Sequence, residues 1–408
     1  MRSFTYLLII ILPAFFVAYA AADDGHARSP GFIKDCSQLH VSQYCAKTMS
    51  SVFDAHGRLW SAWVNGQYLY VNYSDDKGLT FSRAVKVNAV AEKIAAGREH
   101  RPKIKVSDAG LVFLSWTKKL AKRFTGDIRF SRSVDGGKSF TVPVTVNDNR
   151  EIISHRFDVL GVNKKGDIYI SWLDKRDKQK ADRANQEYNG AAVYFSASFN
   201  DGKSFTENKK IADNSCECCR MAMDFDQQAL PVISWRHIYG DNIRDHSMVN
   251  FKNKMEADKP YRLSYDNWKI KGCPHHGPSI SIDKYNVYHA VWFNNAEKRH
   301  GIFYANSHDK GKIFSSTLQI GNYANKASHA DILAVNERVY IVWQEYVQSR
   351  YQIFMLKSVD KGNSWSKPVL IAETSGIPDY PFLLTDGQSI FSSWHILEQP
   401  YHLILLEK

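Results

Sequence analysis

Seven short apolar segments, each ending in a tryptophan, recur along most of the chain. Each is preceded by a strand of alternating polarity and a polar turn, and a third strand follows it. The tryptophans lie 51 to 63 residues apart, at Trp63, Trp116, Trp172, Trp235, Trp292, Trp343 and Trp394. Four short antiparallel strands repeated at this length are typical of a β-propeller blade. The pattern predicts an all-β protein, a seven-bladed β-propeller with four antiparallel strands per blade; six blades plus a degenerate unit is the alternative.

A second repeated pattern follows the third strand of five units. It reads Ser-x-Asp-x-Gly-x-Ser/Thr-aromatic, or a close relative, and its copies begin at Ser74, Ser133, Ser198, Ser307 and Ser358. The Ser and Asp side chains can accept hydrogen bonds from backbone N–H groups of the turn, and the glycine permits a positive φ. The octet therefore predicts a turn held by its own side chains, with the terminal aromatic packed between blades.

This octet resembles the Asp box of bacterial neuraminidase repeats, whose name we use for it, and residues 45–408 resemble the sialidase superfamily and its propeller relatives. The resemblance implies that the Asp boxes are structural and lie on the face away from the active site. There are two departures from that family. Its Arg-Ile-Pro motif is replaced by His100-Arg101-Pro102, and seven tryptophans are present where sialidases have six blades.

The two ends of the chain carry their own signals. Arg2, an apolar run and the small residues up to Ala22 predict a cleaved signal peptide over residues 1–22 and a periplasmic or secreted protein. We expect residues 23–44, through Pro30 to Lys34, to supply a missing outer strand to the last blade and so close the ring of residues 45–408. No later segment is long and apolar enough to span a membrane.

The net charge of +11 favours anionic partners. Its positive residues are scattered and no nucleic-acid-binding motif is present, so no nucleic-acid partner is expected.

The connections that enter each inner strand are the candidate functional segments. If the Asp boxes occupy one face, these connections open on the other face and converge at the mouth of the central channel. They carry His, Arg, Cys and Tyr side chains, and the expected substrate-binding residues are His100, Arg101, His155, Arg156, Arg220, His276 and His329. Arginine forks in such a ring suit a carboxylate or sulfate.

The sialidase resemblance implies roles for some of these residues. Three arginines hold the substrate carboxylate in that family, and their nearest counterparts are Arg101, Arg156 and Arg220. Asp174 is then the candidate acid, and Tyr380 with Glu345 the candidate nucleophile pair, because a tyrosine needs a carboxylate neighbour to react.

Six cysteines fit an oxidising compartment, and Cys36 with Cys45 could close a small N-terminal loop. The other four lie in two segments, and two interpretations of them stay open. Thiolate and imidazole donors suit copper or zinc, while disulfides, one of them joining the first segment to Cys273, are favoured by the compartment. The residues concerned are Cys216, Cys218, Cys219, Cys273 and His275.

Three functions follow as hypotheses. The first is a protein that binds, and hydrolyses if it is an enzyme, acidic glycans of the sialic-acid type, with no cofactor. The second is a non-catalytic copper, zinc or redox protein, and the third is a scaffold that binds a protein partner.

Overall fold

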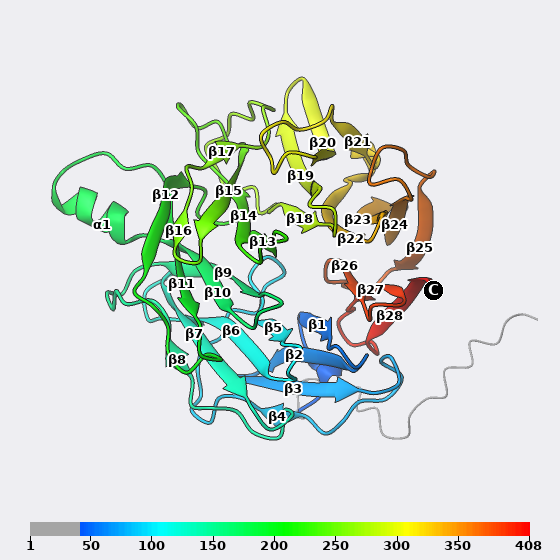
Figure 1. Cartoon of the computed structure of the whole chain (residues 1–408), viewed down its shortest axis with the longest axis horizontal. Coiled ribbons are helices and arrows are strands. Elements are labelled where there is room, and N and C mark those ends of the chain that lie inside the picture. The colour runs from blue at the N-terminus through cyan, green and yellow to red at the C-terminus, as the bar shows by residue number, and fades with distance from the viewer. Residues whose placement is uncertain (1–40) are drawn as a thin grey trace, which may run out of the picture. The chain divides into compact units, whose positions relative to one another are not determined.

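A computed structural model describes residues 41–408. Seven antiparallel sheets surround a central channel, as Figure 1 shows in a view along that channel. The predicted seven-bladed propeller is confirmed, and the six-bladed alternative is wrong. In the described part of the chain no helix has the length and apolar character needed to cross a membrane.

Blades 1 to 3 each contain four strands. Blade 1 is β1 (Met49–Phe53), β2 (Leu59–Asn65), β3 (Tyr68–Ser74) and β4 (Val85–Lys86). Blade 2 is β5 (Lys103–Val106), β6 (Val112–Lys119), β7 (Gly126–Ser133) and β8 (Val144–Thr145). Blade 3 is β9 (His155–Val162), β10 (Ile168–Asp174), β11 (Ala191–Ser198) and β12 (Lys209–Ser215).

Blade 4 is irregular, because two short strands pair with its third strand. It contains β13 (Ala222–Phe225), β14 (Pro231–Arg236), β15 (His246–Asn253), β16 (Glu256–Ala257) and β17 (Tyr261–Arg262). Blade 5 is β18 (Ser279–Ile282), β19 (Tyr288–Ala296), β20 (Arg299–Ser307) and β21 (Leu318–Ile320), and blade 6 is β22 (Ser328–Val335), β23 (Arg338–Val347), β24 (Arg350–Ser358) and β25 (Val369–Thr374). Blade 7 has three described strands, β26 (Phe382–Thr385), β27 (Ile390–Trp394) and β28 (His402–Glu407).

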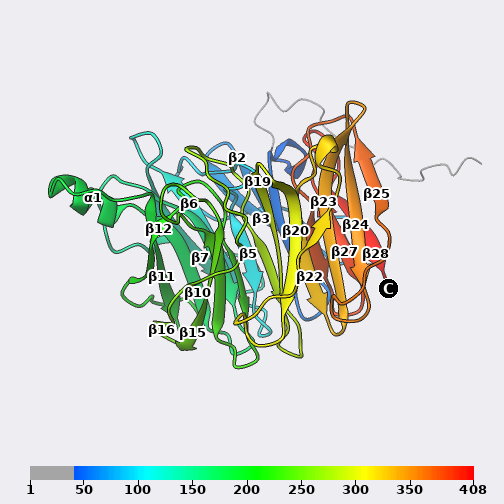
Figure 2. The ribbon, with the colours of Figure 1, turned by 90° about the horizontal axis from the view of Figure 1, so that it is seen from above.

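The first strand of each blade lies next to the channel (Figure 1). Because strands alternate in direction within each sheet, the chain enters every inner strand at one face and makes the turn after the third strand at the opposite face. Figure 2 shows the blades from the side, with connecting loops at both faces. The inter-blade connections and the Asp-box turns are therefore on opposite faces, as the sequence predicted.

Each repeat tryptophan is buried at the end of a second strand, and most donate the indole N–H to a buried acceptor. The acceptor is a carboxylate in blades 2, 3, 5 and 6, at Nε1–O distances of 3.1 Å (Trp116 to Glu92), 2.8 Å (Trp172 to Asp174), 2.7 Å (Trp292 to Asp266) and 2.9 Å (Trp343 to Glu345). Trp235 of blade 4 differs, since its buried Nε1 has no acceptor in the described chain.

The five octets form the expected turns. In blade 2, Gly137 N–H donates to Ser133 Oγ at 2.9 Å, and Ser139 N–H donates to Asp135 Oδ1 at 3.0 Å. Burial plays little part at this exposed carboxylate; hydrogen bonds from Ser139 and Ser133 lower the pKa of Asp135 to about 2. These bonds fix the turn that carries the glycine.

The octet glycine also forms the contact with the preceding blade. A side chain added at Gly137 would meet Trp60 of blade 1, and one added at Gly362 would meet Tyr304 of blade 5. The terminal aromatic reinforces the same contact, as where Trp365 packs edge-on against Tyr304 with ring centroids 4.8 Å apart. Asp-box turns therefore join neighbouring blades as well as strands.

Blades 1 and 7 close the ring through contacts of the same kind. Gly78 lies against Tyr401, and Phe81 packs edge-on against Tyr401 at 5.8 Å between centroids. His395 Nε2 is 2.6 Å from Ala46 O, which ties the chain just before β1 to blade 7. The outer strand expected from residues 30–34 lies outside the described residues, as do the predicted signal peptide and most of the 23–44 segment, so these remain predictions.

The long connection after Trp172 contains a helix, α1 (Arg176–Arg183). Asp174 Oδ1 accepts the N–H of Arg176 at 2.9 Å. The carboxylate that accepts the Trp172 indole N–H therefore also binds the first residue of the helix. Figure 1 shows α1 outside the ring.

The glycine contact gives a test of blade packing. Gly136 and Gly137 both have positive φ (69° and 78°), but an added methyl group would lie 2.5 Å from the Trp60 ring at Gly137 and has nothing within 4 Å at Gly136. Gly137→Ala should therefore lower the free energy of unfolding by about 1–3 kcal/mol more than Gly136→Ala. Urea denaturation of the two variants measures this difference, and equal losses would contradict the contact.

Candidate functional site

The central channel contains a cavity of about 280 Å³ that is lined by residues from all seven blades. The residues that line it at the start of the inner strands include Arg98, Glu99, Arg101 and Arg220, with Phe382 from blade 7. We call this group, together with Tyr380 and His329, the channel mouth. It lies on the face opposite the Asp boxes, where the connections enter the inner strands.

Glu99 occupies the middle of the channel mouth. Its carboxylate accepts from Arg220 Nη1 at 2.7 Å, from Arg220 N–H at 3.2 Å and from Gly277 N–H at 3.2 Å. His329 Nε2 is 3.7 Å from Glu99 Oε1. A single carboxylate thus holds the inter-blade connections that enter blades 2, 4, 5 and 6 in fixed positions.

Arg101 is paired in the same way, with a carboxylate that precedes blade 7. Its Nη2 is 2.5 Å from Asp379 Oδ1, and its Nη1 donates to Met49 O at 2.8 Å. Burial raises the pKa of Asp379, although the Arg101 charge acts in the opposite direction. Arg101 therefore links blades 1, 2 and 7, and the Asp379 carboxylate largely compensates its positive charge.

Tyr380 stacks on His329, with ring centroids 3.5 Å apart and planes 13° from parallel. The Arg98 guanidinium carbon is 5.5 Å from the centroid of Tyr380. Burial, followed by the Glu99 charge, raises the pKa of Tyr380. Within residues 41–408 Arg98 makes no ion pair with a carboxylate, so its charge is available to an anion next to the ring.

The imidazoles of His329, at the mouth, and of its neighbour His276 are neutral at pH 7. His276 packs between Phe293 and His329, at centroid distances of 4.1 Å and 4.3 Å. Burial, then the Arg236 and Arg220 charges, lowers the pKa of His276 to about 3, and burial next to His276 lowers the pKa of His329 well below its usual value. The positive charge around the cavity therefore comes from its arginines and from Lys103 and Lys105, which also line it.

The structure brings together five of the predicted site residues: Arg101, Arg220, His276, His329 and Tyr380. Arg156 does not line the channel cavity; its Nη2 is 3.3 Å from His100 Nδ1. His100 is buried and its Nε2 accepts the N–H of Phe157 at 3.1 Å. The expected clamp of Arg101, Arg156 and Arg220 is thus wrong in its middle member, and Arg98 lies at the mouth instead.

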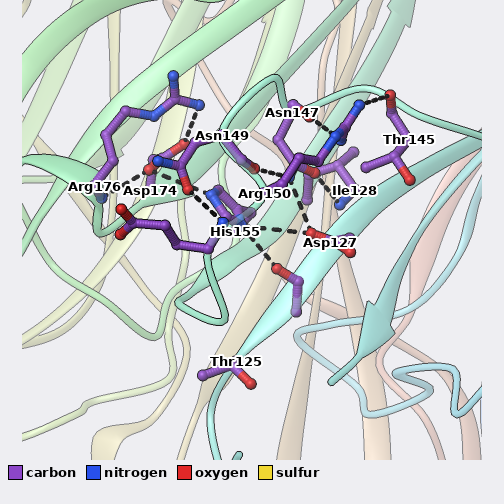
Figure 3. Close-up of polar contacts among 12 residues, drawn as sticks. Thr125, Asp127, Ile128, Thr145, Asn147, Asn149, Arg150, His155, Asp174 and Arg176 are labelled. Atoms are coloured by element: carbon purple, nitrogen blue, oxygen red, sulfur yellow. Dashed lines mark hydrogen bonds and ion pairs between the residues drawn. The ribbon is translucent and has the colours of Figure 1, made fainter. Parts of the chain in front are cut away.

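His155 is also placed away from the channel cavity. Figure 3 shows its ring between Asp127 and Asp174, with ring nitrogens 3.7 Å and 3.8 Å from these carboxylates. Its Nδ1 lies 2.9 Å from Gly126 O, and the residue is fully buried. His155 joins blades 2 and 3 and has no surface to offer a ligand.

The two predicted catalytic carboxylates have structural contacts. Asp174 accepts from Trp172 and from Arg176 Nη2, both at 2.8 Å, and is fully buried. Glu345 accepts from Trp343 and from Asn322 N–H, at 2.9 Å and 2.8 Å. Neither lines the channel cavity, so the expected pair of Tyr380 and Glu345 is not formed, and Glu99 is the carboxylate next to Tyr380.

Sequence reasoning missed Arg98, Glu99 and Asp379 as site residues. Each is a direct neighbour of a residue that was selected, in Arg98-Glu99-His100-Arg101 and Asp379-Tyr380. The signal that could have found them is charge complementarity, since buried arginines at a channel require carboxylate partners.

Cys216, Cys218, Cys219 and Cys273 are free thiols in this structure, so the expected bond to Cys273 is not formed here and the disulfide interpretation stays a prediction. Cys216, Cys218 and Cys219 are buried together, and their sulfurs lie within 4.8 Å of one another. Cys273 is exposed and outside this group. His275 lies close by, with Nδ1 3.0 Å from Cys218 O. Cys45 is disulfide-bonded, but Cys36 lies outside the described residues, so the Cys36–Cys45 loop stays a prediction.

A larger cavity, of about 750 Å³, lies between the outer strands of blades 4 and 5, where blade 4 lacks an Asp box. Tyr261, Lys310 and Phe314 are among its lining residues. We give it less weight than the channel mouth because it contains none of the converging inner-strand side chains.

Two substitutions test whether the predicted catalytic carboxylates, Asp174 and Glu345, have structural roles. Asp174→Asn should lower the free energy of unfolding by about 1–3 kcal/mol, because it weakens charged hydrogen bonds to Trp172 and Arg176. Glu345→Gln should act similarly through Trp343. Thermal denaturation measures the loss, and ligand binding of the folded variants should be unchanged; a selective loss of activity with unchanged stability would restore a catalytic role.

Stability should also depend on pH through buried histidines. Within residues 41–408, burial lowers the pKa of eight histidines: His100, His155, His237, His246, His276, His289, His329 and His395. The unfolded chain takes up these protons near pH 6.5 and the folded chain does not, so their contribution is complete above that pH and is lost below it.

Four buried aspartates, whose pKa values burial raises, act in the opposite direction; they are Asp224 (pKa about 6), Asp266, Asp331 and Asp379. The histidines outnumber them, so the thermal midpoint should fall from pH 7 to pH 5. A midpoint that rises on acidification would show that the aspartates dominate.

Comparison with known proteins finds no matching family model and no matching curated relative. Solved structures do match. A protein of unknown function from Dyadobacter fermentans is 14% identical over 79% of this chain and 97% of its own, with a TM-score of 0.51. A Hadza microbial sialidase is 13% identical over 86% of this chain and 76% of its own, with a TM-score of 0.51. A PL25 ulvan lyase is 9% identical over 88% and 92%, with a TM-score of 0.54. At these identities the likeness shows the propeller fold alone.

Proposed function

We propose that the channel mouth binds an acidic glycan through its carboxylate group, with Arg98 as the primary anchor. The observation that carries this proposal is the position of Arg98, which has no carboxylate partner in residues 41–408 and lies 5.5 Å from the centre of the Tyr380 ring. Arg101 and Arg220 flank the same site but are held by Asp379 and Glu99.

The charge balance supports an anionic ligand. Five cationic side chains line the channel cavity, and three carboxylates line it with them, while Asp379 pairs with Arg101 from beside it. The cations are Arg98, Arg101, Lys103, Lys105 and Arg220, and the carboxylates are Glu99, Asp158 and Asp331. The nearby histidines are neutral, so a small excess of positive charge remains. In such a site a charge-assisted bidentate hydrogen bond is stronger than in open water. A carboxylate would complete the pairing that Arg98 lacks.

The aromatic groups support a sugar as the bearer of that carboxylate. Tyr380 stacks on His329, and Phe382 lies under Arg101, with the guanidinium carbon 4.4 Å from its centroid. Aromatic side chains offer flat apolar surface for the C–H face of a sugar ring. Two matching structures bear on the same class: one is a sialidase, and another, the ulvan lyase, is bound to a GlcA(1-4)Rha3S glycan.

Catalysis is the further step of the proposal. Tyr380 is the proposed nucleophile, and Glu99, whose charge acts on Tyr380, is proposed as its base in the role expected of Glu345. The structure brings no second acid to this pair from the predicted set, since Asp174 is held by Trp172 and Arg176. Glycan binding is therefore proposed as the primary activity and hydrolysis as the activity to be tested.

The N-terminal sequence supports a place of action outside the cytoplasm.

Titration calorimetry with sialyllactose, a glucuronate-containing oligosaccharide and neutral lactose tests the proposal. Arg98→Ala should weaken binding of the acidic ligands about 10- to 100-fold, the loss expected for a charged hydrogen bond. Arg83→Ala is the matched control, because Arg83 is an exposed arginine next to an Asp-box turn on the opposite face. Equal affinity of Arg98→Ala and wild type, or binding of lactose as tight as that of the acidic sugars, would contradict the site.

Turnover of a fluorogenic sialoside separates an enzyme from a binding protein. If the protein is a hydrolase, Tyr380→Phe should abolish turnover while calorimetry still detects binding. Binding without turnover in the wild type would establish a lectin-like role, and neither binding nor turnover with any acidic glycan would overturn the proposal.

A further inference from the structure

The three buried cysteines of blade 4 lie in the short connection between β12 and β13, immediately before Arg220 of the channel mouth. Cys216, Cys218 and Cys219 are 1%, 5% and 2% exposed. Their sulfurs belong to three residues within a span of four, a spacing that brings all of them to one side of a tight turn.

The sulfur positions match a metal site and do not match a disulfide. Cys216 Sγ is 3.7 Å from Cys218 Sγ and 4.0 Å from Cys219 Sγ. Thiolates bound to one metal at about 2.3 Å lie about 3.8 Å apart in tetrahedral and about 4.0 Å apart in trigonal geometry. A disulfide would require about 2.05 Å.

The turn is held in place from three sides. Cys216 N–H donates to Arg236 O at 2.9 Å, His275 Nδ1 lies 3.0 Å from Cys218 O, and Arg220 N–H donates to Glu99 at 3.2 Å. The ligand positions are therefore set by the surrounding blades before any ion binds, which reduces the ordering cost of binding.

The surroundings also suit bound thiolates. Arg244 Nη1 donates to Cys216 Sγ at 3.1 Å. Three thiolates bound to a monovalent or divalent ion give a complex with net negative charge. A cationic donor to one of the sulfurs stabilises that charge, as second-shell donors do in metal sites. The sulfurs are otherwise buried among apolar side chains that include Phe157, Trp235 and Met221.

We propose that Cys216, Cys218 and Cys219 form a three-thiolate binding site for a soft metal ion, copper(I) in the first place. Soft thiolate ligands favour copper(I) and zinc. Structural zinc is almost always four-coordinate, and in residues 41–408 the group contains only these three His, Cys, Asp or Glu donors. Copper(I) is satisfied by three thiolates, so the donor number distinguishes the two ions. On binding, each thiol that is a ligand loses its proton to solvent.

The site does not depend on the proposed glycan function, and the two can fail separately. Metal binding to reduced protein is measured without oxygen by competition with a chromophoric copper(I) chelator, with zinc in a parallel series. We expect one copper(I) per chain, an ultraviolet thiolate-to-copper absorption band, and zinc binding that is weaker than copper binding.

Matched cysteine variants assign the ligands. Cys218→Ser should lower copper(I) affinity at least about 100-fold, while Cys273→Ser, which removes an exposed thiol outside the group, should leave it unchanged. Arg244→Met should lower the affinity about 10- to 100-fold, the range seen when second-shell groups are removed. Circular dichroism checks that each variant is folded, and Cys219→Ser replaces Cys218→Ser if the latter is not.

Three results would overturn the proposal. They are copper(I) affinity that is equal in wild type and in a folded cluster variant, tighter binding of zinc than of copper(I), and alkylation without reductant showing that two of the three cysteines are oxidised in the isolated protein. The last result would identify a stable disulfide in place of a metal site.

Discussion

Contact between neighbouring blades is the constraint on which this structure depends. A twisted four-stranded sheet cannot bury both of its faces alone, so each blade needs the next one, and the last needs the first. Tyr304 illustrates the contact, because Gly362 and Trp365 of the following blade both lie against it. Five hydrogen-bonded turns repeat this device around the ring, and one of them, with Gly78 and Phe81 against Tyr401, joins blade 1 to blade 7.

The channel mouth is a consequence of that ring. Seven inner strands begin at the same face, so residues far apart in the sequence meet there, such as Arg101 and Asp379. The ion pairs of the mouth cross blade boundaries, and removing one partner of a buried pair typically costs about 3–5 kcal/mol. The ion pairs of the candidate site therefore also hold the blades in register. Arg98 is the arginine of the mouth that has no carboxylate partner in residues 41–408.

Blade 4 departs from the repeat in several ways at once. It lacks an Asp box, its Trp235 has a buried indole N–H without an acceptor in the described chain, and three cysteines stand before its inner strand. A blade that lacks the repeated stabilising contacts and carries thiols in their place is where a functional site is expected. Its position next to Arg220 places that site beside the channel mouth, although its chemistry differs from that of the mouth.

The sequence by itself determined the architecture, because the period of the tryptophans and of the Asp boxes is a local property that every blade repeats. It also determined which face carries the connections that enter the inner strands, since antiparallel order alternates the faces. Tertiary structure decided which side chains at that face are accessible. Asp174 was the candidate acid and Glu345 the candidate partner of Tyr380, but each lies two residues after a buried indole that needs an acceptor. Arg98 and Glu99 became site residues only when the ring brought Arg220 and Tyr380 beside them, because pairing of charges across blades depends on distances that no single repeat contains.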